Sequence, residues 1–172
     1  QLKKADLDKV TSSLANARKA FLENMVAPVE GKWYYISSTD NSREGDSYTH
    51  GASIYAEKPG TGSNVKWGAN ENGELAGQSL AMWRVIPVKN AETPHTVYIQ
   101  NMGTGLYLGG ESVNLSYVTH LSDTPVAFTV TFVGNSDLAI CATENNTNKT
   151  SLHAQVAGNT VVGWYYNMGG VD

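Results

Sequence analysis

Cysteine is nearly absent from this sequence, which contains a single one, Cys141, among 172 residues. One cysteine cannot form an internal disulfide, and a cysteine-based metal site needs several. The four histidines are scattered singly, with no pair two or four residues apart. We therefore expect no metal site, no cofactor and no disulfide framework.

Charged side chains are also scarce. They make up 16% of the chain, against roughly 25% in typical soluble domains, and the net charge is -4. A chain without a basic excess offers no positive surface for a phosphate backbone, so we expect no nucleic-acid partner. No apolar run reaches the ~18 residues that a membrane-spanning helix needs, so we expect no membrane insertion.

Uncharged hydrogen-bonding residues replace the missing charges. Asn, Ser and Thr together make up about a quarter of the chain, with 17 Gly and 5 Pro beside them. Such residues suit turns and exposed strand positions. The apolar content of 41% is enough for a core at this length, which excludes intrinsic disorder.

The first 25 residues have the period of an α-helix. Their apolar residues, spaced by three or four positions, are Leu7, Val10, Leu14, Ala17, Phe21 and Met25. Pro28 is expected to end the helix, because proline disfavours helical geometry in the residue before it. The apolar stripe either packs on the domain that follows or belongs to a preceding helical bundle, and the sequence leaves both open.

From residue 31 the period changes to two. Short segments rich in β-branched and aromatic residues alternate with Gly, Asn, Asp and Ser clusters, which predicts an all-β domain. Three segments, 34–38, 97–101 and 138–142, share an apolar or aromatic pair that leads to an isoleucine and a polar turn. Further strands follow each of them. This repeat predicts a β-trefoil of three four-stranded units.

The predicted units span about 31–90, 94–135 and 136–172, after a helix and linker over 1–28. The aromatic that closes a unit, Trp83 or Phe128, comes 47 or 29 residues after the unit's isoleucine. In the third unit it would fall between about 169 and 187. We therefore expect the last strand to be missing, and either the parent protein to continue beyond Asp172 or another segment to close the fold.

Residues 31–36, 98–108, 152–154 and 161–164 carry a resemblance to a known family. Over roughly 31–172 the chain resembles the ricin-type β-trefoil lectins. More closely, it looks like the trefoil-like domains appended to secreted polysaccharide-degrading enzymes of bacteria. The family's Gln-x-Trp ending appears here as Ala81-Met82-Trp83 and Val126-Ala127-Phe128.

This resemblance implies a secreted, periplasmic or cell-surface protein, with a glycan or polysaccharide ligand and a catalytic domain in the same polypeptide. It also implies shallow pockets, each with an aromatic residue on the third strand of a unit and polar groups nearby. The residues expected to bind sugar are Trp67, Asn70, Tyr117, Asn101, Trp164 and Gln155. The acidic residue of such pockets is absent, since Gly51, Gly109 and Gln155 stand near the matching positions.

Two functions from different classes fit this pattern. The first is a non-catalytic carbohydrate-binding accessory module, and the second is a structural spacer that packs on a catalytic domain through the helix stripe and exposed aromatics. The spacer predicts that Trp67 and Trp164 contact protein in the full-length molecule. In a separate, purely structural interpretation the aromatics are core or hairpin-packing residues, as we expect for Trp83 and Phe128 in any case. An enzyme is not expected, because the carboxylate pairs Glu44/Asp46 and Glu71/Glu74 lie in loops with no catalytic motif around them.

Overall fold

The computed structural model describes residues 3–26, 30–38, 51–68, 77–93, 95–109, 119–133, 137–142, 150–155 and 157–165. Within these ranges the chain forms one α-helix, ten strands and two short 3-10 helices. In chain order they are α1 (Lys4–Val26), β1 (Ser53–Ala56), β2 (Val65–Gly68), η1 (Ser79–Ala81), β3 (Trp83–Pro87), β4 (Thr96–Asn101), β5 (Tyr107–Gly109), β6 (His120–Ser122), β7 (Phe128–Val133), β8 (Asp137–Ala142), β9 (Thr150–Gln155), η2 (Ala157–Asn159) and β10 (Thr160–Tyr165).

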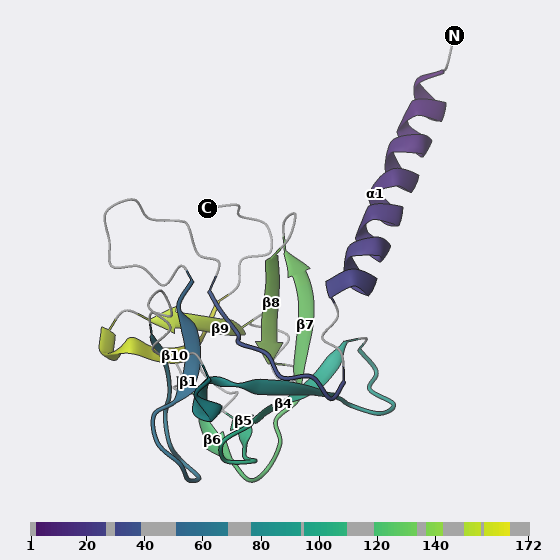
Figure 1. Cartoon of the computed structure of the whole chain (residues 1–172). Helices are drawn as coiled ribbons and strands as arrows, with labels where there is room; N and C mark the ends of the chain where they lie inside the picture. The colour runs from purple at the N-terminus through teal and green to yellow at the C-terminus, as the bar shows by residue number, and fades with distance from the viewer. Residues whose placement is uncertain are drawn as a thin grey trace.

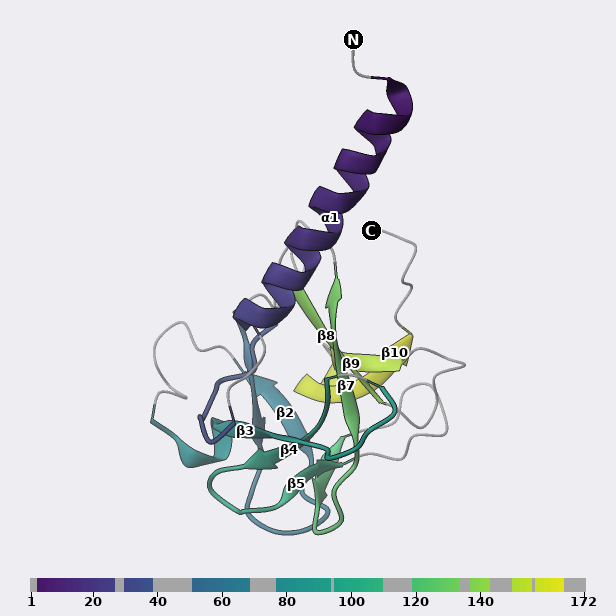
Figure 2. The same ribbon diagram turned by 90° about the vertical axis from the view of Figure 1, so that its right-hand side faces the viewer.

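Helix α1 forms where the apolar period predicts it, and it projects away from the β-domain (Figures 1 and 2). Leu7, Val10 and Leu14 are 57%, 61% and 69% exposed. The stripe therefore does not pack on the following domain over residues 3–17, which are all exposed. No helix in the described part of the chain has the length and apolar character needed to cross a membrane.

The strands follow the predicted repeat. The first unit begins with the bridges Tyr34–Trp83 and Ser37–Ser53 and continues through β1, β2 and β3. The second unit is β4 to β7, and the third begins with β8, β9 and β10. Each unit contains an antiparallel hairpin, β1–β2, β5–β6 or β9–β10. The pair β4–β7 joins the first and last strands of the second unit, and the pairs β3–β4 and β7–β8 join one unit to the next.

The third strands of the units meet one another. The amide of Leu121 donates to the Ser63 carbonyl at 2.8 Å, and the amide of Val65 donates to the Thr119 carbonyl at 2.9 Å. Thr119 in turn donates to the Val161 carbonyl from its amide at 2.9 Å and from its hydroxyl at 2.6 Å. Because Val65, Leu121 and Val161 are buried, these bonds bring the three units together around a buried apolar centre.

The core consists of the inward-facing residues of these strands. Trp83 and Phe128 are 0% and 1% exposed, which confirms the prediction that they are core residues. The indole N–H of Trp83 donates to the Ile54 carbonyl at 3.0 Å, so the polar atom of this tryptophan is satisfied inside the protein.

Two details of the repeat differ from the sequence pattern. The second strand of the first unit is β1, and the segment 47–50 that the repeat assigned to it lies outside the described residues. The third strand of the second unit is β6, and its predicted location at 115–117 also lies outside them. Residues 166–172, where the last strand of the third unit would begin, are likewise outside the described ranges.

Candidate functional site

Trp67 was predicted as a sugar platform, but the structure places it in the core. It is 7% exposed and pairs with Ile54 across the β1–β2 hairpin. Burial alternates along β2, so that Val65 and Trp67 face inward while Lys66 and Gly68 face outward. An indole buried in this way has no face to offer a pyranose ring, so the expected exposed platform is not found at this position.

Asn101 is also fully buried, at 0% exposure. Its amide nitrogen donates to the Leu80 carbonyl at 2.8 Å, while its amide oxygen accepts from the Gly103 amide at 3.1 Å and from the Thr104 hydroxyl at 3.2 Å. The side chain thus satisfies backbone and turn groups within the protein. The structure therefore makes Asn101 a structural residue that fixes the turn after β4, in place of the expected sugar contact.

The remaining predicted residues are not gathered into a pocket by the described part of the chain. Asn70 and Tyr117 lie outside the described residues. Trp164 and Gln155 have described backbones in β10 and β9, where they pair with Ser151 and Thr160 respectively, whereas their side chains are outside the description.

The register of the hairpins also separates the two tryptophans that the sequence repeat equates. Trp67 follows the central residue Val65 by two positions, whereas Trp164 follows the central residue Val161 by three. These tryptophans therefore do not occupy equivalent positions in the fold.

A different set of aromatic and polar side chains lies on the outward face of β3, β4 and β5. Burial alternates along β4, which leaves Tyr98 and Gln100 partly exposed. Across the sheet, Gln100 pairs with Arg84 of β3 on one side and with Tyr107 of β5 on the other. These residues are neighbours because direct cross-strand partners lie on the same face of a sheet.

Hydrogen bonds hold the polar centre of this face in one arrangement. The Nε of Arg84 donates to the Oε1 of Gln100 at 2.7 Å, and the Nε2 of Gln100 donates to the Gly105 carbonyl at 2.6 Å. The Arg84 guanidinium lies 5.2 Å from the ring centroid of Trp33, a cation–π distance. Gln100 is thereby fixed at both ends of its amide.

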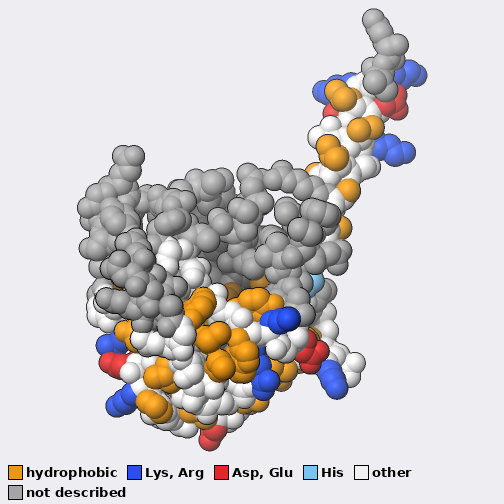
Figure 3. Space-filling model, in the orientation of Figure 1, with side chains coloured by type: hydrophobic (Ala, Val, Ile, Leu, Met, Phe, Trp, Pro, Cys, Tyr) orange, Lys and Arg blue, Asp and Glu red, His pale blue; other side chains and the backbone are white. Residues whose placement is uncertain are grey.

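Aromatic rings surround that centre. Tyr98 and Tyr107 meet edge to face, with centroids 6.2 Å apart and planes at 71°. We call the five partly exposed residues of this surface the aromatic–amide face: Trp33, Arg84, Tyr98, Gln100 and Tyr107. Figure 3 shows exposed hydrophobic side chains gathered on the surface in front of β4, with Lys or Arg side chains at their edge.

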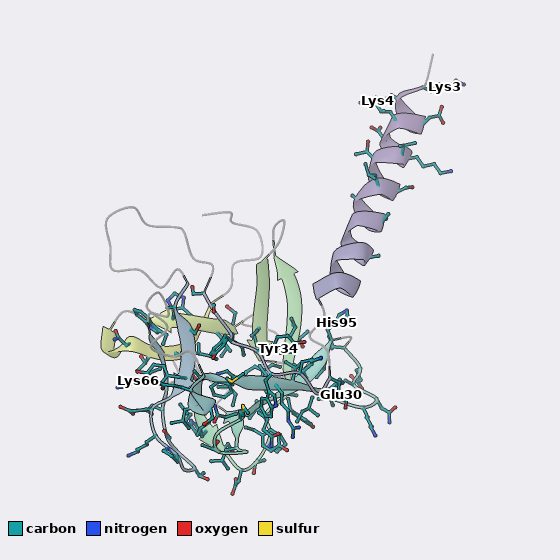
Figure 4. The ribbon with its side chains drawn as sticks, in the orientation of Figure 1. Lys3, Lys4, Glu30, Tyr34, Lys66 and His95 are labelled. Carbon is teal, nitrogen blue, oxygen red and sulfur yellow. The ribbon has the colours of Figure 1, made fainter. Side chains whose placement is uncertain are left out.

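Ionic interactions lie elsewhere. In the part of the chain that the structure describes, one ion pair is seen, between the Nζ of Lys66 and the Oε1 of Glu57 at 2.7 Å. The hydrogen bond from Lys66 lowers the pKa of the Glu57 carboxyl, and the same bond raises the pKa of Lys66. Figure 4 places Lys66 at the side of the β-domain, apart from Tyr34, the residue that follows Trp33.

The described residues contain no group of three or more His, Cys, Asp or Glu side chains that could hold a metal ion. The chemistry available on the aromatic–amide face is that of recognition, through aromatic surfaces, amide groups and guanidinium donors. The sequence pattern did not indicate this face, because the family resemblance implies pockets on the third strands of the units. An arginine between Trp83 and Val85, in the middle of a predicted strand, was the signal that could have revealed it.

Comparison with known proteins identifies the fold. The structure is similar to that of a designed 3-fold symmetric protein, ThreeFoil, with a TM-score of 0.61 and 15% identity over 80% of this chain and 91% of that one. The chain adopts a β-trefoil fold. It is also similar to the PSL1a chain in a PSL1a–E64 complex, with a TM-score of 0.56 and 16% identity. That match covers 81% of this trefoil chain but less than half, 44%, of the other. No protein-family model and no curated protein matches the sequence.

Proposed function

We propose that this trefoil is a non-catalytic carbohydrate-binding module that binds a glycan or polysaccharide through the aromatic–amide face. The observation that carries the proposal is the arrangement of Tyr98, Tyr107 and Trp33 around the fixed amide of Gln100. The apolar C–H face of a pyranose packs on aromatic rings, while amide and guanidinium groups hydrogen-bond its hydroxyls.

The fixed polar centre favours binding because less side-chain freedom is lost when a ligand arrives. Open, wet surfaces of this kind still leave little net affinity, so we expect dissociation constants on the order of millimolar for a single sugar. In line with the resemblance in its sequence, the module would belong to a larger secreted glycan-processing protein. Tethering would raise the local concentration of a catalytic domain on its polysaccharide.

A glycan array followed by calorimetric titration of the binding polysaccharide tests the proposal. The truncation Tyr107→Ala removes one ring of the face, and we expect it to weaken binding about tenfold. Tyr55→Ala is the matched control, because Tyr55 is a partly exposed tyrosine of β1, a strand that does not pair with β3, β4 or β5. The absence of binding to plant and mucin glycans, or an equal loss of affinity in both variants, would contradict the proposed binding face.

The exposed stripe of α1 supports a second candidate, a spacer that docks on a catalytic domain without binding sugar. Leu7, Val10 and Leu14 are apolar, exposed and aligned on one side of the helix. In this case tryptophan fluorescence stays unchanged with every sugar, and hydrogen exchange in the full-length protein is slowed along α1. Fast exchange along α1 in the full-length protein would exclude the spacer.

A further inference from the structure

Arg84 is the one residue with a formal charge on the three strands of the aromatic–amide face. Strand β3 otherwise contains Trp, Val, Ile and Pro, β4 contains Thr, Val, Tyr, Ile, Gln and Asn, and β5 contains Tyr, Leu and Gly. The chain as a whole has a net charge of -4, so this face differs in sign from the average surface.

The Arg84 guanidinium has no carboxylate partner among the described residues, where the one ion pair joins Lys66 to Glu57. Its Nε is bonded to Gln100, and its plane lies near the ring of Trp33. Neither contact uses the N–H groups of the two terminal nitrogens as hydrogen-bond donors. Those groups form the edge of an arginine that binds carboxylates and sulfate-like anions with two parallel hydrogen bonds.

We infer that the ligand of the aromatic–amide face is an acidic glycan, and that Arg84 binds its carboxylate or sulfate group. The inference rests on the proposed carbohydrate-binding function and deepens it. The aromatic rings contact the sugar ring, and the guanidinium selects the charged substituent. Gln100 and Trp33 hold that guanidinium in place, so its ordering is largely complete before the ligand arrives.

A purely structural role for Arg84 makes a different prediction. In such a role, the cation–π contact serves only to attach the segment 30–38 to strand β3 through Trp33. In that case Arg84→Gln lowers the thermal stability but changes binding to charged and uncharged glycans by the same factor. Discrimination between charged and uncharged forms of one polymer is therefore the readout that separates the two roles.

The experiment is calorimetric titration at 0.15 M salt with matched pairs of polymers. The carboxylate arm compares polygalacturonate with its fully methyl-esterified form, and hyaluronan with carboxyl-reduced hyaluronan. The sulfate arm compares dextran sulfate with dextran. We expect the chain to bind the charged member of at least one pair about tenfold more tightly than the uncharged member, and the arm that responds identifies the anion.

Arg84→Gln should abolish this preference, and Arg84→Lys should restore part of it, because lysine keeps the charge but loses the planar fork. Lys4→Gln is the control with the same change in net charge. Figure 4 places Lys4 at the far end of α1 from the β-domain, and its substitution should leave the preference unchanged.

Three other outcomes would contradict the inference, and they differ in what they mean for the proposed function. Equal losses from Arg84→Gln and Lys4→Gln would mean non-specific attraction of a polyanion and would overturn the inference. Binding to neutral glycans alone overturns the acidic ligand and leaves the proposed function standing. Binding to neither the array nor any matched pair overturns both.

Discussion

The two faces of strand β4 use their side chains in opposite ways. Val97, Ile99 and Asn101 face the core and are 7%, 0% and 0% exposed, whereas Tyr98 and Gln100 between them are partly exposed. On the inner face, the polar side chain is satisfied by the protein itself. On the outer face, hydrogen bonds fix the amide while the aromatic rings and the Arg84 guanidinium remain accessible to a partner. One strand therefore supplies both core residues that stabilise the trefoil and surface residues of its candidate binding site.

The largest effect on stability should come from truncating Trp83, which is buried, in comparison with Trp33, which is partly exposed. Trp83→Ala removes a fully buried side chain and leaves the Ile54 carbonyl without its indole donor, so we expect a loss of about 3–5 kcal/mol of unfolding free energy. Trp33→Ala is the same truncation on the outer face and should cost about 1 kcal/mol, mainly its cation–π contact. Urea denaturation followed by circular dichroism measures both, and equal losses would contradict the difference in burial between Trp83 and Trp33.

A smaller effect is expected from two amides that stand two residues apart. Asn101→Ala leaves the Leu80 carbonyl without its partner inside the protein and removes one of the two acceptors of the Gly103 amide, which keeps the Ser79 carbonyl. This should cost about 1–3 kcal/mol. Gln100→Ala removes hydrogen bonds on the exposed face, where water can replace them, and should cost less than about 1 kcal/mol. The same denaturation experiment checks this order, and a larger loss at Gln100 would contradict it.

The smallest effect concerns the exposed Glu57–Lys66 pair. The Lys66 hydrogen bond lowers the pKa of Glu57 below its usual 4.5, so the pair stabilises the protein above that pH, and this contribution disappears as the pH falls through the lowered value. The raised pKa of Lys66 means that the contribution is lost again at pH values above about 10.5. We expect Glu57→Gln to lower Tm slightly at pH 6 and not at pH 3, as measured by thermal unfolding. A Tm difference that is unchanged at pH 3 would contradict this assignment.

Much of the fold could be predicted from the sequence. The spacing of Leu7, Val10 and Leu14 by three and four residues predicts α1, because this period is typical of an amphipathic α-helix. The isoleucine-centred repeat predicts the trefoil, because it recurs three times and because buried and exposed residues alternate along the strands, as in β4. Strand positions within the first two units were less predictable: β1 and β6 occur after the segments that the repeat had assigned to them.

The candidate site could not be predicted in the same way. Trp67 and Trp164 are alike in sequence context, but the register of their hairpins gives them different positions, and register depends on pairing between strands. The contact between Arg84 and Gln100 joins residues 16 positions apart on different strands. No spacing rule along the chain identifies such a pair.

By itself, the sequence determined the kinds of element, their order and the repetition of the units, because these follow from local period and turn residues. Which side chains face outward together depends on strand pairing and burial in the folded protein. Pairing and burial place Trp67 and Asn101 inside and bring Trp33, Arg84, Gln100 and Tyr107 to one surface. The physical reason is that a strand's two faces are equivalent until pairing and burial make one of them the core.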